Sequence, residues 1–450
     1  MPNLPLTHLS AWQRPLTRRG FLDVTARSAA YLALARALAG CGSSDGAGAG
    51  GAVRGRIGAI GALAPSADVP GLLIPPGFRA RILAQANQIV PGTPLVWHTD
   101  PDGGATYATE DGGWIYVSNR EFLPGGVNAL RFDAQGAVVD GYTVLPGALT
   151  RINCGGGITP WQTWLSGEEY DLGLLWECDP RGVGQPQPLP ALGMFAHEAA
   201  AVDPRTNWVY ETEDKPDGRF YRFIPDTPNV GGRADLSSGR LQVMQVQAAQ
   251  DAVASARIGD IFAVQWRDVP NPTPVDLSVI PLPLSMVTDA LAGVLPLFTA
   301  TRHQVPESTA FRGGEGIWYH DGLIYFTTKG DRRVWAHDPL AQTLTCVYDD
   351  DAFPQPVLDS VDNIVVTPGG DLVIVEDKAE PNQQAVALCA DGRIVPLVEV
   401  SGQDGSEVTG PAFSPDGRHF YFSSQRGPGA NASTGTAGIT YCVSGPWFVP

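Results

Sequence analysis

The stretch Asp321-Gly322-Leu323-Ile324-Tyr325-Phe326-Thr327 joins a tight turn to a run of β-branched and aromatic residues. Glycine takes the positive φ that such a turn demands, and the run that follows is typical of a strand. The same pattern recurs six times, and most copies follow an Asp-Gly or Gly-Gly turn. The six segments are Trp114–Ser118, Thr163–Ser166, Trp208–Thr212, Leu323–Thr327, Leu372–Val375 and His419–Ser423.

Each of these segments is followed by a further strand-like segment that ends in another turn. The second set comprises Ala129–Asp133, Leu174–Asp179, Phe220–Ile224, Val334–Asp338, Val386–Cys389 and Ile439–Cys442. Six such units, without long helical patterns, predict an all-β protein with the fold of a six-bladed β-propeller. A β-sandwich is the alternative, but it does not explain why every unit follows the same internal pattern.

Two segments lie outside the repeats of the expected propeller domain, residues 71–450. Phe78–Leu83 reads as one more strand, and we expect it to complete the last blade and close the ring. Residues 227–310, with a helix near 286–298, are expected to form an insertion between blades three and four.

Polar residues recur at matching places in the six units. The start of each expected innermost strand and the far end of the repeated strand that follows it are 14 to 19 residues apart. One hairpin of that length returns its end beside its start, so both sets should meet at one mouth of the central channel. The starts carry Asp102, Cys154, Glu198, Glu315, Asp362 and Glu407. The far ends carry Glu121, Glu169, Glu213 with Asp214, Lys329, Glu376 with Asp377, and Gln425.

Crowded carboxylates raise one another's pKa, and bound metal cations are the simplest way to offset the repulsion between the ionised groups. For any single Asp or Glu, a solvated strand end is the commoner explanation, but recurrence in six units weakens it. Cys154 is the exceptional member. A thiolate suits iron, zinc or copper, whereas carboxylates suit calcium. The pattern therefore predicts a mixed-metal site. The cysteines of the expected outer strands, Cys178, Cys346, Cys389 and Cys442, are interpreted as buried thiols.

The first 41 residues predict export. Arg18-Arg19 precede the apolar run Ala29–Leu34, and Leu38-Ala39-Gly40-Cys41 closes the segment. This order is typical of a twin-arginine signal that ends in a lipobox, with Cys41 acylated. A membrane-spanning helix is the alternative, but arginines interrupt the run, which falls short of the roughly 20 apolar residues that a span needs. Residues 42–70 are expected to form a flexible tether.

The expected location is therefore periplasmic or at the cell surface, with membrane contact only through the lipid anchor. The chain has a formal net charge of −17, and no basic stripe offsets it. This charge excludes nucleic acid as a partner. It also repels free phosphate esters at long range, so an anionic substrate would need metal charge to hold it.

Five motifs resemble segments of the PhoX alkaline phosphatases, in the same order, from about residue 75 onward. The resemblance implies a six-bladed propeller, twin-arginine export and a cluster of ferric iron (Fe3+) and calcium (Ca2+) ions. The five motifs are Asn153-Cys154-Gly155-Gly156-Gly157-Ile158-Thr159-Pro160-Trp161, Phe195–Ala199, Gly314–Ile317, Asp362–Ile364 and Glu407–Gly417. The first of them is the most specific.

Carried over by position, the resemblance makes Cys154 and Glu169 iron-cluster ligands, with Glu198 and Glu315 as the carboxylates of the next motifs. Asp362, Glu407 and either Glu376 or Asp377 follow from it as well. With the spacing argument, the candidate metal ligands are Asp102, Cys154, Glu169, Glu198, Glu213, Glu315, Asp362, Glu376, Asp377 and Glu407.

The chain departs from the family pattern in two respects. It is shorter than typical members, and its last strand runs into Phe422–Gly429 where the family tends to end with Gln-His. Residues that hold substrate phosphate are assigned by position alone, to Arg312, Lys329 and Lys378. With Cys154 these three make up the candidate catalytic residues.

The expected activity is hydrolysis of small phosphate monoesters by a monomeric, metal-dependent enzyme. Multivalent cations would clamp the phosphoryl oxygens and activate an oxygen nucleophile. A Gly-x-Ser-x-Gly elbow and metalloprotease histidine spacing are both absent from the sequence. Two alternatives stay open. One is a calcium-dependent hydrolase of the lactonase type, which needs neither Cys154 nor iron. The other is a non-catalytic lipoprotein whose metals only neutralise the channel.

Overall fold

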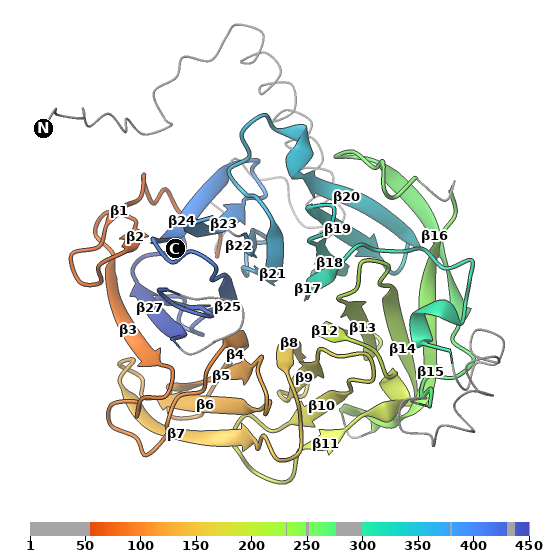
Figure 1. Cartoon of the computed structure of the whole chain (residues 1–450), viewed down its shortest axis with the longest axis horizontal. Coiled ribbons are helices and arrows are strands. Elements are labelled where there is room, and N and C mark those ends of the chain that lie inside the picture. The colour runs from red at the N-terminus through yellow and green to blue at the C-terminus, as the bar shows by residue number, and fades with distance from the viewer. Residues whose placement is uncertain are drawn as a thin grey trace, which may run out of the picture.

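The computed structural model describes residues 55–230, 232–248, 252–275, 299–378, 380–429 and 437–449. The regular secondary structure of this part of the chain is almost entirely β-strand, arranged around one axis in a propeller-like fold (Figure 1). The prediction of an all-β protein is confirmed. No helix among the described residues is long and apolar enough to span a membrane. The helical turns in the described part of the chain are η2 (Pro190–Leu192), η5 (Thr301–His303) and η6 (Asp350–Ala352).

Five antiparallel sheets make up the structure, and three of them have four strands. The first contains β4 (Pro101–Ala108), β5 (Trp114–Arg120), β6 (Val127–Phe132) and β7 (Val138–Leu145). The second contains β8 (Asn153–Ile158), β9 (Trp164–Glu168), β10 (Leu175–Cys178) and β11 (Gln187–Pro188). The third joins β25 (Val408–Phe413), β26 (His419–Ser424) and β27 (Ile439–Ser444) to β3 (Arg79–Gln85).

The other two sheets are larger. The nine-stranded sheet begins with β12 (His197–Asp203), β13 (Trp208–Glu213), β14 (Phe220–Val230), β15 (Arg233–Val246) and β16 (Ile261–Asp268). It continues through β20 (Thr343–Asp349), β19 (Arg333–Asp338), β18 (Leu323–Thr328) and β17 (Gly314–His320). The six-stranded sheet contains β21 (Val361–Val366), β22 (Leu372–Glu376), β23 (Asn382–Leu388), β24 (Ile394–Ser401), β2 (Leu72–Ile74) and β1 (Ala64–Pro65).

Six strands surround the central axis and form a closed ring in which each contacts the next: β4, β8, β12, β17, β21 and β25 (Figure 1). The nine-stranded sheet supplies two of them, one at each end. All six repeated segments form the strand beside an inner strand, and all six second segments form the next strand outward. The predicted repeat is therefore confirmed strand by strand.

The repeated segments are apolar on both faces because each sheet packs between two neighbours. In β18, Ile324 and Phe326 point into the core shared with β12–β16, whereas Leu323 and Tyr325 point into the core shared with β21–β23. Successive side chains of a strand alternate between faces, so one run of apolar residues serves two cores. This explains why the repeats contain near-continuous apolar runs rather than apolar and polar residues in turn.

Small residues allow the inner strands to approach one another closely. A Cβ on Gly157 would lie 1.8 Å from the carbonyl oxygen of Ala200, and one on Gly155 would lie 2.6 Å from that of Glu198. Both separations are far below van der Waals contact. The glycines of the cysteine motif are therefore required by the packing of β8 against β12, whatever the motif does chemically.

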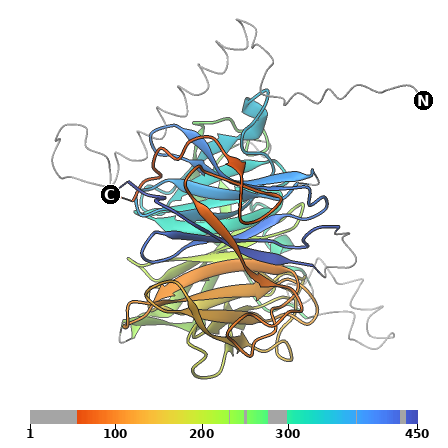
Figure 2. The ribbon, with the colours of Figure 1, turned by 90° about the vertical axis from the view of Figure 1, so that its left-hand side faces the viewer.

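The ring closes between the two ends of the chain. β3 pairs with β27, so the predicted closing strand is confirmed. Figure 2 shows the orange N-terminal strand lying against the blue C-terminal strands. The sheets extend further toward the N-terminus than residue 71. Ile57, Ile60 and Val69 are buried in the core, and β1 pairs with β2, so the described part of the predicted tether belongs to the packed fold.

The described parts of the predicted insertion extend the nine-stranded sheet. Residues after 226 continue β14 and form β15, and β16 pairs with both β15 and β20. β16 thereby joins the strands β12–β15 to the strands β17–β20 in one continuous sheet. The predicted helix near 286–298 and the predicted signal, residues 1–41, lie outside the described residues.

Candidate metal centre

A β-bulge recurs at the start of the inner strands. Between Asn153 and Gly156 the inner strand β8 has one residue more than its partner β9, which spans Glu168 to Ser166 over the same distance. The same irregularity occurs in the other five hairpins of the ring. Bulges turn a side chain out of the regular alternation of a strand and are common beside active sites. In five of the six hairpins the first residue of the bulge is a candidate ligand: Asp102, Cys154, Glu198, Glu315 or Asp362.

The sixth hairpin is built differently. Its bulge comprises Gly410 and Pro411, between Thr409 and Ala412, and Glu407 precedes β25. Gly410 has a φ of +58°, and a Cβ there would lie 2.6 Å from the carbonyl oxygen of Asp102. A side chain at this bulge would therefore collide with β4. The carboxylate of this hairpin comes instead from the residue that leads into the strand.

The second set of side chains comes from the residue directly after each repeated strand. Its backbone N–H closes the hairpin: that of Glu169 donates to the carbonyl of Ile152 at 2.9 Å, and that of Asp377 donates to the carbonyl of Ser360 at 2.9 Å. The six residues in this position are Glu121, Glu169, Asp214, Lys329, Asp377 and Gln425.

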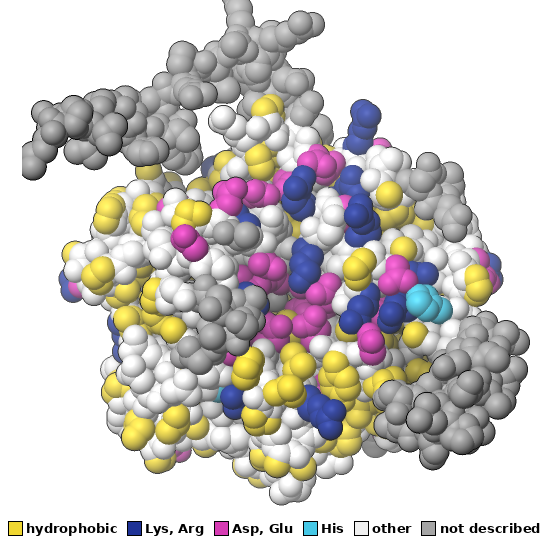
Figure 3. All heavy atoms as spheres, in the orientation of Figure 1, with side chains coloured by type: hydrophobic (Ala, Val, Ile, Leu, Met, Phe, Trp, Pro, Cys, Tyr) yellow, Lys and Arg dark blue, Asp and Glu magenta, His cyan; other side chains and the backbone are white. Residues whose placement is uncertain are grey.

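These two sets meet, as the spacing predicted. In each of four groups of three residues, the possible ligand atoms lie within 4.8 Å of one another, and each group shares a residue with the next. Figure 3 shows acidic side chains gathered at the centre of this face, with basic side chains around them. We call the nine residues of the four groups the mouth cluster: Asp102, Glu121, Cys154, Glu169, Glu198, Glu315, Asp362, Asp377 and Glu407.

Few cations offset this charge. Lys329 Nζ lies 2.7 Å from Glu315 and 2.9 Å from Asp214, and Arg426 lies 2.8 Å from Glu407. Among the described residues, these two basic side chains are the ones that pair with carboxylates of the mouth cluster. Eight carboxylates therefore face two cations.

Burial raises the pKa of the acidic groups. It raises the pKa of Glu169 to about 8, with further contributions from Asp214 and Glu315. It raises the pKa of the Cys154 thiol well above its usual range, with Asp102 adding to the effect. Burial opposes the charge of Lys329, but Glu315 and Asp214 outweigh it, so the pKa of Lys329 is raised. The cluster must hold either protons or multivalent cations, and metal binding displaces the protons.

Hydrogen bonds orient part of the cluster. Asn363, 6% exposed, donates to Asp362 at 3.0 Å and accepts from the backbone N–H of Gly410 at 2.9 Å. Asn119 donates to the backbone carbonyls of Cys154 and Gly155. Neither asparagine was among the predicted site residues. Asn363 directly follows a candidate ligand and could have been found, whereas Asn119 lies in another repeat and has no local signal.

Two predicted ligands do not join the mouth cluster. Glu213 accepts hydrogen bonds from the Tyr221 hydroxyl at 2.9 Å and the Arg219 backbone at 3.0 Å. Glu376 accepts from the backbone N–H of Asp359 and of Gln384, both at 2.8 Å. Each is the last residue of its strand, and side chains alternate along a strand, so the residue that follows reaches the channel instead.

The predicted phosphate-binding residues have three different environments. Lys329 contacts the mouth cluster, as described above. Lys378 pairs with Glu376 at 2.9 Å, outside the cluster. Arg312 is exposed, has no ion pair among the described residues, and lies beside the loop that carries Lys329, because its carbonyl accepts the N–H of Gly330 at 2.8 Å. Glu121 and Arg426 complete the surroundings. The repeat spacing places Glu121 at this mouth, in the same position as Glu169, although Glu121 was not among the predicted metal ligands. Arg426 was not among the predicted site residues.

All five described cysteines, Cys154, Cys178, Cys346, Cys389 and Cys442, are reduced and buried. Cys178, Cys346 and Cys442 lie in the outer strands β10, β20 and β27, and Cys389 follows β23, which is consistent with buried structural thiols. Cys154 is the one cysteine among them whose sulfur lies with carboxylate oxygens in a possible metal site.

Comparisons with known proteins agree with the fold. A family model described as alkaline phosphatase PhoX matches residues 170–429. The solved structure of PhoX from Pseudomonas fluorescens with vanadate, a transition-state analogue, is similar in fold, with a TM-score of 0.63 and 16% identity. That alignment covers 87% of this chain and 98% of the other. A gluconolactonase from Xanthomonas campestris aligns over 86% of this chain and 99% of its own, with a TM-score of 0.42 and 11% identity, too low to carry an argument. No curated protein matches the sequence.

Proposed function

This chain belongs to the alkaline phosphatase PhoX family, and on that premise we propose that it hydrolyses small phosphate monoesters at the mouth cluster. Its enzymatic class is that of an alkaline phosphatase. For the fold, we count six blades by treating the nine-stranded sheet as two, β12–β16 and β17–β20. A bulge in each of the six inner hairpins, five of which begin with a candidate ligand, supports this count.

One observation carries the proposal. The thiol of Cys154 belongs to two of the four groups of ligand atoms, one with Asp102 and Glu121 and one with Glu169 and Glu198. Carboxylate oxygens are the ligands that calcium prefers, and a thiolate suits iron. The donor set therefore fits a cluster of Fe3+ and Ca2+, in which Cys154 would be an iron ligand. Such cations, when bound, supply Lewis-acid stabilisation of charge on the phosphoryl group.

The protein's own groups contribute position and charge. Asn119 and Asn363 hold the backbone of Cys154 and the carboxylate of Asp362 in place. Lys329 and Arg312 are the basic residues that we propose attract a phosphate dianion, because Lys329 contacts the cluster and Arg312, which has no ion pair among the described residues, lies beside the Lys329 loop. Lys378 already neutralises Glu376, so we propose no contact between Lys378 and substrate.

We further propose that the protein is exported and anchored through Cys41, as a monomer that acts outside the cytoplasm. The support is the order of paired arginines, apolar run and lipobox in the first 41 residues. An export pathway that carries folded proteins suits a metal cluster assembled before translocation. Mass spectrometry of the membrane fraction tests the anchor, since an acylated Cys41 would be the first residue of the mature chain.

The function is tested on protein folded in the cell and purified without chelators. Iron and calcium are measured per chain, and hydrolysis of p-nitrophenyl phosphate is assayed for the natural chain and for Cys154→Ala. We expect both metals in the natural protein, and loss of iron together with activity in the variant. Cys389→Ala, which removes a buried thiol outside the cluster, should keep both. Calcium without iron would favour the lactonase alternative. Both metals without phosphatase activity would favour a non-catalytic scaffold.

A further inference from the structure

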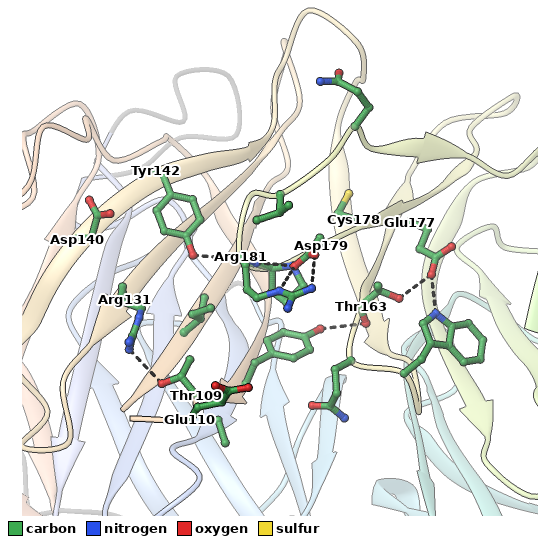
Figure 4. A pocket seen from close by; sticks show the side chains of 18 of the residues that line it. Thr109, Glu110, Arg131, Asp140, Tyr142, Thr163, Glu177, Cys178, Asp179 and Arg181 are labelled. Atoms are coloured by element: carbon green, nitrogen blue, oxygen red, sulfur yellow. Dashed lines mark hydrogen bonds and ion pairs between the residues drawn. The ribbon is translucent and has the colours of Figure 1, made fainter. Parts of the chain in front are cut away.

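A second cavity lies far from the mouth cluster, between the sheet β4–β7 and the sheet β8–β11 (Figure 4). Its volume is about 990 Å³, and its wall includes Tyr107 near the end of β4 and Trp161 in the turn after β8. The same two strands carry Asp102 and Cys154 at their other ends. At about 3.3 Å per residue, the cavity is on the order of 15 Å or more from those ligands. A molecule bound here would not touch the cluster.

The indole of Trp161 is held in a fixed orientation in the cavity wall. Glu177, 6% exposed, accepts a hydrogen bond from Trp161 Nε1 at 2.6 Å and one from the Thr163 hydroxyl at 2.7 Å. The other oxygen of Glu177 pairs with Arg233 at 2.5 Å. Trp161 packs against the apolar core that contains Leu165, while its surface also lines the cavity. A ring held in this way loses little conformational freedom when a ligand stacks on it.

The charges of the lining disfavour an anionic ligand. All three guanidinium groups are paired with carboxylates of the same wall, and two further carboxylates remain. A phosphate group would therefore meet no unpaired cation among the lining residues. The pairs are Arg131 with Asp111 at 2.5 Å, Arg181 with Asp179 at 2.6 Å, and Arg233 with Glu177; the remaining carboxylates are Glu110 and Asp140.

The same groups suit a neutral molecule rich in hydroxyls. Each guanidinium–carboxylate pair presents N–H donors and oxygen acceptors side by side, and a hydroxyl can use both. Gln162, Gln185 and Gln187 add amides to the wall. A sugar ring also has an apolar C–H face that can cover an aromatic ring, and aromatic side chains combine such a surface with a polar edge.

We propose that this cavity binds a neutral oligosaccharide, with one sugar ring stacked on Trp161 and its hydroxyls hydrogen-bonded to the guanidinium–carboxylate pairs. The volume is at the upper end of the range for small-molecule sites, about 300–1,000 Å³. It therefore suits several sugar units better than one. The proposal is independent of the phosphatase function, because the two sites lie at opposite ends of the same strands.

The experiment titrates the intact, metal-loaded protein with cellotetraose, maltotetraose and chitotetraose in a calorimeter. At least one should bind, and Trp161→Ala should weaken that binding about tenfold or more, which corresponds to about 1.4 kcal/mol. Arg181→Ala removes an exposed pair that contributes little to folding, and it should weaken binding severalfold. Trp208→Ala is the matched control, because each tryptophan is half-buried and has an arginine over its ring, Arg233 for Trp161 and Arg222 for Trp208, but Trp208 lies at the start of β13.

Hydrolysis of p-nitrophenyl phosphate should be unchanged in Trp161→Ala, which would also show that this variant folds. The proposal is overturned if none of the three tetrasaccharides binds at about 10 mM, a concentration at which even weak sites fill. Equal binding by natural and Trp161→Ala protein would overturn it as well. So would binding of inorganic phosphate or spermidine that depends on Trp161 when no saccharide binds.

Discussion

The side-chain amide of Asn119 donates a hydrogen bond to the backbone carbonyl of Cys154 at 2.8 Å. It donates its second hydrogen to the carbonyl of Gly155 at 2.7 Å, and its oxygen accepts from Trp164 Nε1 at 2.9 Å and from Ser166 at 3.1 Å. The side chain is fully buried, and its hydrogen-bonding capacity is complete. Asn119 belongs to the first sheet and Cys154 to the second, so the position of the thiol is set between sheets.

Asn119→Ala should therefore disturb the metal site as well as the fold. Two buried carbonyls would lose their donor, and each such loss costs about 1–3 kcal/mol. We expect a fall in the free energy of unfolding of about 2–5 kcal/mol, measured by urea denaturation, and a loss of iron per chain. Asn128→Ala is the control. Asn128 is a buried asparagine of the same sheet that bonds to His98 and Thr143. The Asn128→Ala protein should lose stability but keep its iron. An Asn119→Ala protein with full iron content would contradict the positioning role.

Gly157→Ala should prevent the inner ring from closing. The new methyl group would lie 1.8 Å from the carbonyl oxygen of Ala200, and both atoms belong to backbones held by neighbouring strands. We expect a loss of more than about 4 kcal/mol, seen as little or no folded protein. Gly58→Ala is the matched control, since a Cβ there would lie 3.7 Å from its nearest neighbour, the carbonyl of Trp447. A Gly157 variant that folds with natural stability would show that β8 and β12 can separate.

Lys329→Met should weaken binding of a phosphate substrate. Lys329 provides a cation at the mouth cluster, and a hydrogen bond to a charged group contributes about 1.5–3 kcal/mol. We expect the KM for p-nitrophenyl phosphate to rise about tenfold or more. Lys215→Met serves as control, because Lys215 pairs with the exposed Asp171 at 3.1 Å and does not contact the cluster. An unchanged KM in the Lys329 variant would show that Lys329 neutralises Glu315 but does not contribute to substrate binding.

Acid should destabilise the protein through its buried histidines. Burial lowers the pKa of His337 from 6.5 to about 4, although the hydrogen bond to the Thr343 carbonyl opposes this. The unfolded chain therefore binds a proton that the folded chain rejects. The stability contributed by the neutral ring is full above about pH 6.5 and is lost as the pH falls toward 4.

The size of this effect follows from the shift. At 1.36 kcal/mol per pKa unit, His337 should account for on the order of 3 kcal/mol between neutral pH and pH 4. Urea denaturation of natural and His337→Gln protein at several pH values measures the difference. The variant should lose less stability on acidification. Parallel curves for the two proteins would mean that His337 takes up its proton without cost in the folded state.

The repeats were predictable because their physical cause is local. A run such as Leu323–Thr327 after Asp321-Gly322 is both a hairpin signal and an apolar surface for two cores, so every repeated strand was found. The spacing of Cys154 and Glu169 also identified the two ends of one hairpin. Choices between adjacent residues could not be made in this way. Whether Glu376 or Asp377 reaches the channel depends on the residue at which β22 ends, and the repeats locate that end only to within one or two residues.

The sequence by itself determined the repeated strands, their order around the axis and the mouth to which the acidic residues belong, because hairpin turns and alternation act over a few residues. Only the tertiary structure decided which side chains share a site. Five of the six bulges turn a candidate side chain at the start of an inner strand out of the regular alternation, and hydrogen bonds such as that from Asn119 to Cys154 join residues of different sheets. These contacts depend on how closely the inner strands pack, and close packing exists only once the ring has closed.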